Sequence, residues 1–81
     1  MRRFHFHFRA GDELMLDDEG IDLPDFSAAQ REAALSAREL LAEAIRSGNQ
    51  KIPDALVIAD DDGRTLDTVQ LAAILPPRLK K

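Results

Sequence analysis

The chain of 81 residues contains no cysteine, no tryptophan and no tyrosine. Without cysteine it cannot form disulfides, thiolate zinc sites or a cysteine nucleophile. Glycine is also scarce, with four residues, and neither a glycine-rich phosphate loop nor a glycine-flanked serine nucleophile occurs. These gaps remove cysteine chemistry, phosphate-loop chemistry and the glycine-flanked serine nucleophile. We therefore expect a protein that is not an enzyme and that holds no cofactor.

Long apolar runs are missing as well. No stretch approaches the roughly 18 apolar residues of a membrane span. The first residues, MRRFHFHF, lack the apolar segment of a secretion signal. We expect a cytoplasmic protein with no membrane partner.

Basic residues are outnumbered, with 11 against 15 acidic ones and a formal charge of −4. Proteins that bind nucleic acid usually present a basic face, so a nucleic-acid partner is not expected. Several of the basic residues lie at the two ends of the chain. We predict one domain over residues 1–75 and a basic tail over 76–81.

The most regular stretch of the sequence is RRFHFHFR, in which large residues alternate. Phe4, Phe6 and Phe8 share one face, and Arg3, His5, His7 and Arg9 share the other. A period of two predicts a half-buried strand. A turn at residues 10–12 and a returning strand at 13–17 complete a hairpin, and residues 21–25 read as an extended linker.

One long helix follows the linker. We expect it to begin near Ser27, with the Ser27 hydroxyl and Gln30 forming a capping box. Residues 28–46 contain neither glycine nor proline, and Gly48 is suited to the C-terminal cap. Small alanines on one face of this helix would let it lie close to a sheet that carries phenylalanines.

Two more strands are expected after the helix. Residues 55–59 are continuously apolar, Asp60 to Gly63 is a turn signal, and residues 65–69 can return as a strand. The predicted fold is α+β in the order β-β-α-β-β, with one mostly antiparallel four-stranded sheet and a single helix on one face. Because residues 55–59 are apolar on both faces, we expect the second face to be covered in a homodimer.

His5 and His7 are the clearest candidates for a metal site. Residues two apart on a strand project from one face, about 6.6 Å apart. A zinc site takes at least three protein ligands, however, and the sequence gives no reason to place a carboxylate such as Asp17 or Asp67 beside the pair. We interpret both histidines as the outer side of the strand and keep metal binding as a third hypothesis.

Four elements of the sequence carry a resemblance: the aromatic-histidine strand at 4–8, the D-x-x-G-x-x-L-P-D element at 17–25, the alanine-rich helix at 29–41 and the D-x-x-G-R hairpin at 60–64. Together they resemble a family of small bacterial proteins of unknown function. The resemblance implies a fold and brings no activity.

A more remote similarity, in layout only, is to HicB-like antitoxins. In those proteins a small sheet with one helix binds and masks a ribonuclease toxin. Here Phe26 follows Asp25 where that family usually has Pro-Gly, and the chain lacks an appended DNA-binding domain. The leading hypothesis is thus an interaction or regulatory protein whose surface is the open sheet face around Arg3, His5, His7 and Arg9. Its partner would be a second copy or a small protein, with an antitoxin module as the alternative.

Overall fold

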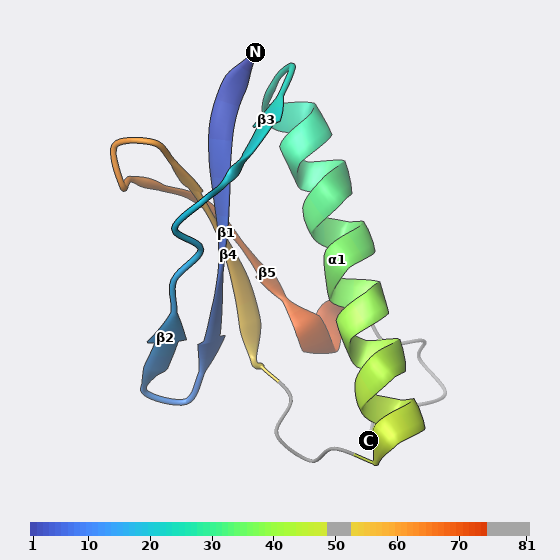
Figure 1. Ribbon diagram of the computed structural model, residues 1–81. Helices are drawn as coiled ribbons and strands as arrows, with labels where there is room; N and C mark the ends of the chain where they lie inside the picture. Colours follow the sequence, from blue (N-terminus) through green and yellow to red (C-terminus); the bar gives the residue numbers. More distant parts are fainter. Residues whose placement is uncertain (49–52, 75–81) are drawn as a thin grey trace.

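The computed structural model describes residues 1–48 and 53–74, and these form one sheet with one long helix (Figure 1). The strands are β1 (Arg2–Ala10), β2 (Glu13–Met15), β3 (Ile21–Leu23), β4 (Ala55–Asp60) and β5 (Thr65–Gln70). Helix α1 (Phe26–Ser47) connects β3 to β4, and a short 3-10 helix, η1 (Leu71–Ile74), follows β5. The predicted α+β class with a single α-helix is confirmed. The predicted tail at 76–81 lies outside the described residues.

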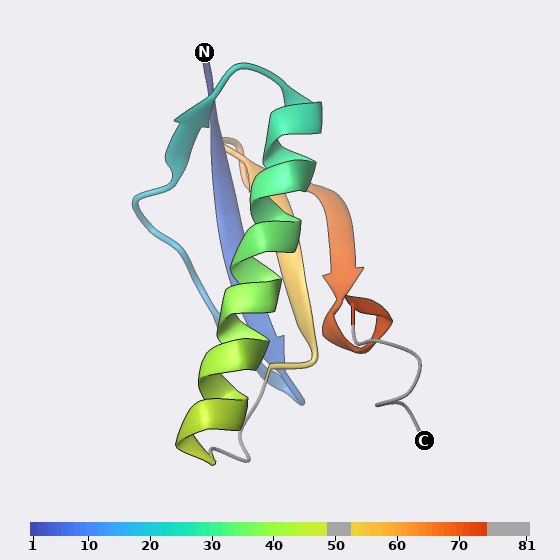
Figure 2. The ribbon, with the colours of Figure 1, turned by 90° about the vertical axis from the view of Figure 1, so that its right-hand side faces the viewer.

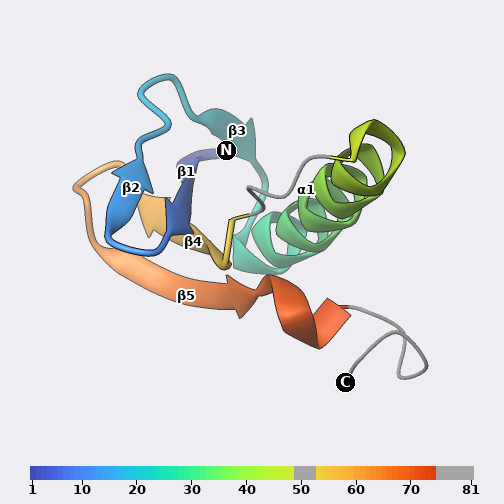
Figure 3. The same cartoon turned by 90° about the horizontal axis from the view of Figure 1, so that it is seen from below.

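Strand β1 is the centre of the sheet. The strand order is β2-β1-β4-β5, and β3 pairs with the same edge of β1 as β2 does. All of these pairs are antiparallel. Seen from below in Figure 3, the strands follow one another in this order, with α1 to one side. The period-two reading of β1 is therefore correct, because its phenylalanines face α1 and its histidines face away.

Strand β3 corrects the expected linker at residues 21–25. Its three residues pair with the first part of β1, and Asp22 lies opposite Arg3. The expected second strand is correspondingly shorter and ends at Met15. A three-residue strand carries too little alternation to be recognised in a sequence, and here pairing with β1 decides its conformation.

The N-terminal cap of α1 is Asp25 and not Ser27. The Asp25 backbone is extended, and its carboxylate accepts a hydrogen bond from the backbone N–H of Ala28 at 2.8 Å. Asp25 satisfies an otherwise orphaned N–H and favours the positive end of the helix dipole. Gly48 closes the helix in the left-handed conformation as predicted, with φ of 70°.

The core lies between α1 and the phenylalanine face of the sheet. Figure 2 shows α1 lying along this face. Phe4, Leu56 and Ile58 are the largest fully buried side chains, and the helix contributes Ala29, Ala33 and Ala37 at 0% exposure. The small alanines bring the helix backbone close to the large residues of the sheet, as expected. Ile45, near the end of α1, is largely exposed.

The opposite face of β4 is already buried within one chain. Ala55, Val57 and Ala59 point away from the helix, and none is more than 7% exposed. Side chains of β1 and β5 flank them on both sides. The continuous apolar run of β4 therefore has cover without a second subunit. Within residues 1–48 and 53–74, no helix combines the length and the apolar character needed to cross a membrane.

Replacing Phe4 by alanine tests this core. Phe4 has no exposed surface, so Phe4→Ala should lower the free energy of unfolding by about 3–5 kcal/mol. Leu35→Ala, at a helix position that is half exposed, should change it by no more than about 0.5 kcal/mol. Urea unfolding followed by circular dichroism measures both. Equal losses would contradict the assignment of the core.

Candidate functional site

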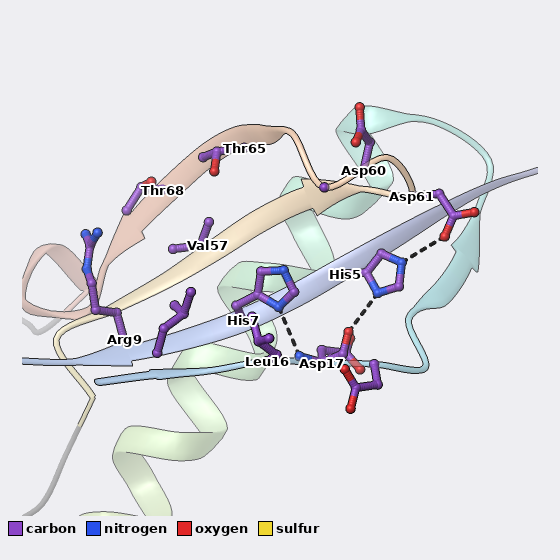
Figure 4. Close-up of a pocket in the computed structure, with 13 residues that line it drawn as sticks. His5, His7, Arg9, Leu16, Asp17, Val57, Asp60, Asp61, Thr65 and Thr68 are labelled. Carbon is purple, nitrogen blue, oxygen red and sulfur yellow. Dashed lines mark hydrogen bonds and ion pairs between the residues drawn. The ribbon is translucent and has the colours of Figure 1, made fainter. Parts of the chain in front are cut away.

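The face of the sheet opposite α1 carries a shallow hollow of about 520 Å³, which we call the trough (Figure 4). Its floor is β4, centred on Val57. Side chains directly opposite one another across the strands form its two walls, with His5, His7 and Arg9 from β1 on one side and Thr65 and Thr68 from β5 on the other. Leu14 and Leu16 extend the β1 wall. The trough is thus apolar at its centre and polar along both walls.

Arg9 and the acidic residues lie at opposite ends of the trough. Figure 4 shows Arg9 beside Thr68 at one end and Asp60 with Asp61 at the other. Asp18 also borders the trough. The trough therefore has a basic end and an acidic end.

His5 is far more enclosed than an outer strand residue is expected to be. Its side chain is 13% exposed. Its Nδ1 lies 2.8 Å from the carbonyl oxygen of Asp17, and its Nε2 lies 3.0 Å from a carboxylate oxygen of Asp61. The pKa of His5 is raised above its ordinary value, first by the hydrogen bond to Asp61 and next by the one to the Asp17 carbonyl, against the opposing effect of burial.

His7 is held by Asp17 as well, which lies in the connection between β2 and β3. The backbone N–H of Asp17 donates to Nδ1 of His7 at 2.9 Å. His7 Nδ1 must then carry a lone pair, which places the proton of the neutral ring on Nε2. The His5 and His7 rings stack with their centroids 6.1 Å apart. Both histidines are thus oriented by the backbone of one residue.

The Asp17 carboxylate completes the edge of β1 between β2 and β3. One oxygen accepts from the backbone N–H of Phe6 at 3.1 Å, and the other accepts from that of Gly20 at 3.1 Å. Burial by itself raises the pKa of Asp17, but hydrogen bonds from the backbone of Phe6, Gly20 and Glu19 together outweigh it and hold the pKa below its ordinary value. Asp17 is an acceptor that the fold requires in its ionised form.

Gly20 makes the close approach that this connection needs. Its φ is 72°, and a Cβ at this position would lie 2.9 Å from Cγ of Arg3, from Cε1 of His5 and from the carbonyl oxygen of Phe4. A backbone oxygen cannot move aside as a flexible side chain can. The sequence D-x-x-G at 17–20 is therefore one unit, in which the aspartate binds the glycine N–H and the glycine lets the chain pass over β1.

The second D-x-x-G segment forms the β4–β5 turn. The Asp60 carboxylate accepts from the backbone N–H groups of Asp62 and Arg64, at 3.0 and 2.8 Å. Gly63 takes φ of 87° and donates to the Asp60 carbonyl. This turn presents Asp61 to His5. The pKa of Asp60 is lowered, chiefly by the Arg64 backbone N–H.

Of the four residues expected to form the binding surface, three border the trough and one does not. His5, His7 and Arg9 line it. Arg3 instead anchors β3, donating from Nε and Nη2 to the two carboxylate oxygens of Asp22 at 3.0 and 3.3 Å, and from Nη1 to the carbonyl of Glu19. Asp22, read as a plain linker residue, is its ion-pair partner. Asp17 and Gly20 were missed as site residues, and the D-x-x-G spacing is the signal that could have found them.

A metal site at His5 and His7 would have to replace existing hydrogen bonds. Both ring nitrogens of His5 and Nδ1 of His7 already have partners. No group of three or more histidine, aspartate or glutamate side chains in the described part of the chain is arranged to hold a metal ion. Asp17 does lie beside the pair, but it meets them with backbone atoms.

A family model described as "Domain of unknown function (DUF6894)" matches residues 3–72. The chain belongs to the DUF6894 family. A search of curated proteins and a search of solved structures each found no match. The family match covers all five strands and α1, which agrees with the resemblance to small proteins of unknown function. Membership in DUF6894 brings no activity, so function has to be argued from the trough itself.

Removing the Asp17 carboxylate should destabilise the protein. Asp17→Ala leaves the backbone N–H groups of Phe6 and Gly20 without their charged acceptor, at an expected cost of about 1.5–3 kcal/mol in the free energy of unfolding. Because the folded-state pKa of Asp17 lies below its ordinary value of 3.8, this contribution is present above that value and is lost as the pH falls through the folded-state pKa.

Asp18→Ala is the matched control for Asp17→Ala, because Asp18 is the exposed neighbouring aspartate. It should change stability by no more than about 0.5 kcal/mol. Urea unfolding at pH 7 and at several lower pH values measures both variants. If the loss of unfolding free energy in Asp17→Ala did not become smaller at low pH, the ionised Asp17 carboxylate would not be the group that stabilises the wild type.

Gly20→Ala separates steric clash from backbone strain when it is compared with Gly11→Ala. Both glycines have positive φ, but a Cβ at Gly11 has nothing within 4 Å. Gly11→Ala should cost the strain alone, about 1–2 kcal/mol, whereas Gly20→Ala also collides with the Phe4 carbonyl and should cost clearly more. Urea unfolding of the two variants gives the comparison, and equal costs would argue against a close approach at Gly20.

Proposed function

We propose that this DUF6894 domain is a non-enzymatic interaction module that binds its partner in the trough. The observation that carries the proposal is that some residues of this face are bonded within the fold while others point outward. His5 and Asp17 are the groups suited to acid–base chemistry, and their side chains are hydrogen-bonded to other parts of the same chain. What faces outward is the hollow itself, bordered by the half-exposed Leu14 and the more exposed Leu16.

The partner that the charges of the trough favour is a second copy of this chain. In a twofold dimer the same surface meets itself, so that the two ends of a patch exchange places across the axis. With the axis near Val57, Arg9 of each copy would lie over the acidic end of the other, at Asp18 and Asp61. Complementary charges of this kind set the register of an interface, while the exposed Leu14 and Leu16 would supply its apolar contacts.

The β5 edge of the sheet is a less suitable place for self-association. Strand β5 is the longer edge strand, since β2 and β3 at the opposite edge have three residues each. On β5 the Asp67 carboxylate accepts a hydrogen bond from the Thr68 backbone N–H at 2.8 Å. The register also shifts between Ile58 and Ala59, because Leu66 of β5 is an extra residue at this step and forms a bulge. Charges and bulges on an edge strand are devices that discourage edge-to-edge pairing. The face is therefore favoured over the edge.

The alternative partner is a small basic protein, as in the HicB-like antitoxin hypothesis. Support for it comes from the net charge of −4 and from the acidic end of the trough. In this alternative the same surface, the trough, binds a small basic protein in place of a second copy of the chain. Metal binding by His5 and His7 has no comparable support, because hydrogen bonds already occupy both ring nitrogens of His5 and Nδ1 of His7.

Leu14→Asp should convert a dimer into a monomer, because it places a charge among the exposed leucines that extend the β1 wall of the trough. Leu35→Asp is the matched control, since both leucines are 51% exposed and Leu35 lies on α1, away from the trough. Sedimentation velocity over a concentration series measures the mass of each. We expect a dimer for the wild type and for Leu35→Asp, and a monomer for Leu14→Asp.

A charge exchange sharpens the same experiment. Arg9→Glu should weaken the dimer, and adding Asp18→Arg to it should restore association. A wild-type chain that stays monomeric throughout would rule out the second copy as partner. The Leu14→Asp and Leu35→Asp proteins would then serve as baits in host lysate, where a basic protein retained by Leu35→Asp and lost by Leu14→Asp would support the alternative.

A further inference from the structure

His5 lies where three segments of the chain meet. It belongs to β1, its Nδ1 contacts the connection between β2 and β3 at the Asp17 carbonyl, and its Nε2 contacts the β4–β5 turn at Asp61. Figure 4 shows the ring between these two partners. No backbone hydrogen bond between the described residues of the β2–β3 connection and those of the β4–β5 turn is present. The imidazole is therefore the bridge between them.

Both partners of His5 can only accept a hydrogen bond. A carbonyl oxygen and an ionised carboxylate oxygen carry no proton, so each ring nitrogen must donate. A neutral imidazole has one N–H, and only the imidazolium has two. The geometry at 2.8 and 3.0 Å is thus complete only when His5 is protonated.

The charges around His5 favour the protonated ring. The β2–β3 connection contributes Asp17 and the β4–β5 turn contributes Asp61, both close enough to act on the His5 charge. Asp60 at the end of β4 is held by the amides of its own turn. On β1 the neighbours are Arg3, which Asp22 of β3 neutralises in an ion pair, and His7, whose ring stacks on His5.

We propose that His5 is a proton-dependent link. When protonated it ties the β4–β5 turn to the β2–β3 connection, and when neutral it no longer holds Asp61, whose carboxylate is then free at the acidic end of the trough. Asp61 is the partner that leaves. Its side chain is 71% exposed and can turn into water, whereas the Asp17 carbonyl is fixed by the hydrogen bonds of its residue to β1. The neutral ring would keep its proton on Nδ1 and turn a lone pair toward Asp61.

The direction of the pH dependence follows from the raised pKa of His5, which Asp61 and the Asp17 carbonyl cause. A raised folded-state pKa means that the link is complete below the ordinary histidine value and is lost as the pH rises through the higher folded-state value. Rising pH would then free a negative charge at the trough. This effect on partner binding rests on the proposed function; the link itself does not.

Nuclear magnetic resonance of the two histidine side chains tests the link directly. The His5 titration midpoint should lie above 6.5 in the wild type, and the backbone amides of residues 60–64 should titrate with it. In Asp61→Ala the midpoint should fall toward 6.5 and the turn amides should no longer follow it. Asp62→Ala, which removes the same charge from the same turn at a similarly exposed position, should behave as the wild type does.

Two results would overturn the link: a wild-type His5 midpoint at or below 6.5, or a midpoint that Asp61→Ala leaves unchanged. The titration is repeated in the Leu14→Asp background. If the His5 midpoint there equals that of the wild type, the link belongs to a single chain. A chain that is monomeric at every pH would defeat the proposed dimer while the titration still decides the link. Dimerisation that varies with pH in the wild type and not in Asp61→Ala would support regulation of the trough.

Discussion

The sheet depends on how Asp17 completes one edge of β1. Strands β2 and β3 are only three residues each, and they pair with opposite ends of that edge. Between them the Phe6 N–H would have no strand partner, and the Asp17 carboxylate takes that place. Because a buried N–H without an acceptor is costly, one side chain allows two short strands to act as a single edge.

The same residue determines what the open face can do. Through its backbone Asp17 orients His5 and His7, and through its carboxylate it binds the amides of Phe6 and Gly20. The two histidines, which the sequence offers as candidate metal ligands, are therefore parts of the scaffold. The outward groups of the trough are Arg9, the threonines and the exposed leucines, and these are the groups that the proposed partner would meet.

The sequence predicts the elements whose pattern is long. Alternation over β1 determines which residues face α1, and the composition of residues 28–46 determines the helix, because each pattern is repeated several times. Strand β3, the cap at Asp25 and the burial of His5 could not be predicted in this way. Strand β3 and the burial of His5 each depend on one tertiary contact, with β1 and with Asp61 respectively. The cap at Asp25 depends on one local bond to the Ala28 N–H. A single contact leaves no period in the sequence.

The two D-x-x-G segments were visible in the sequence, but their relation was not. Each is a local unit in which an aspartate binds the amides of its own turn and a glycine adopts positive φ. Read separately, they predict two turns. In the fold they approach one imidazole from two sides, so a change in one segment alters what the other contacts. Substitutions at Asp17 and Asp61 should therefore not be independent, since groups that share a partner show coupling energies in double-mutant cycles.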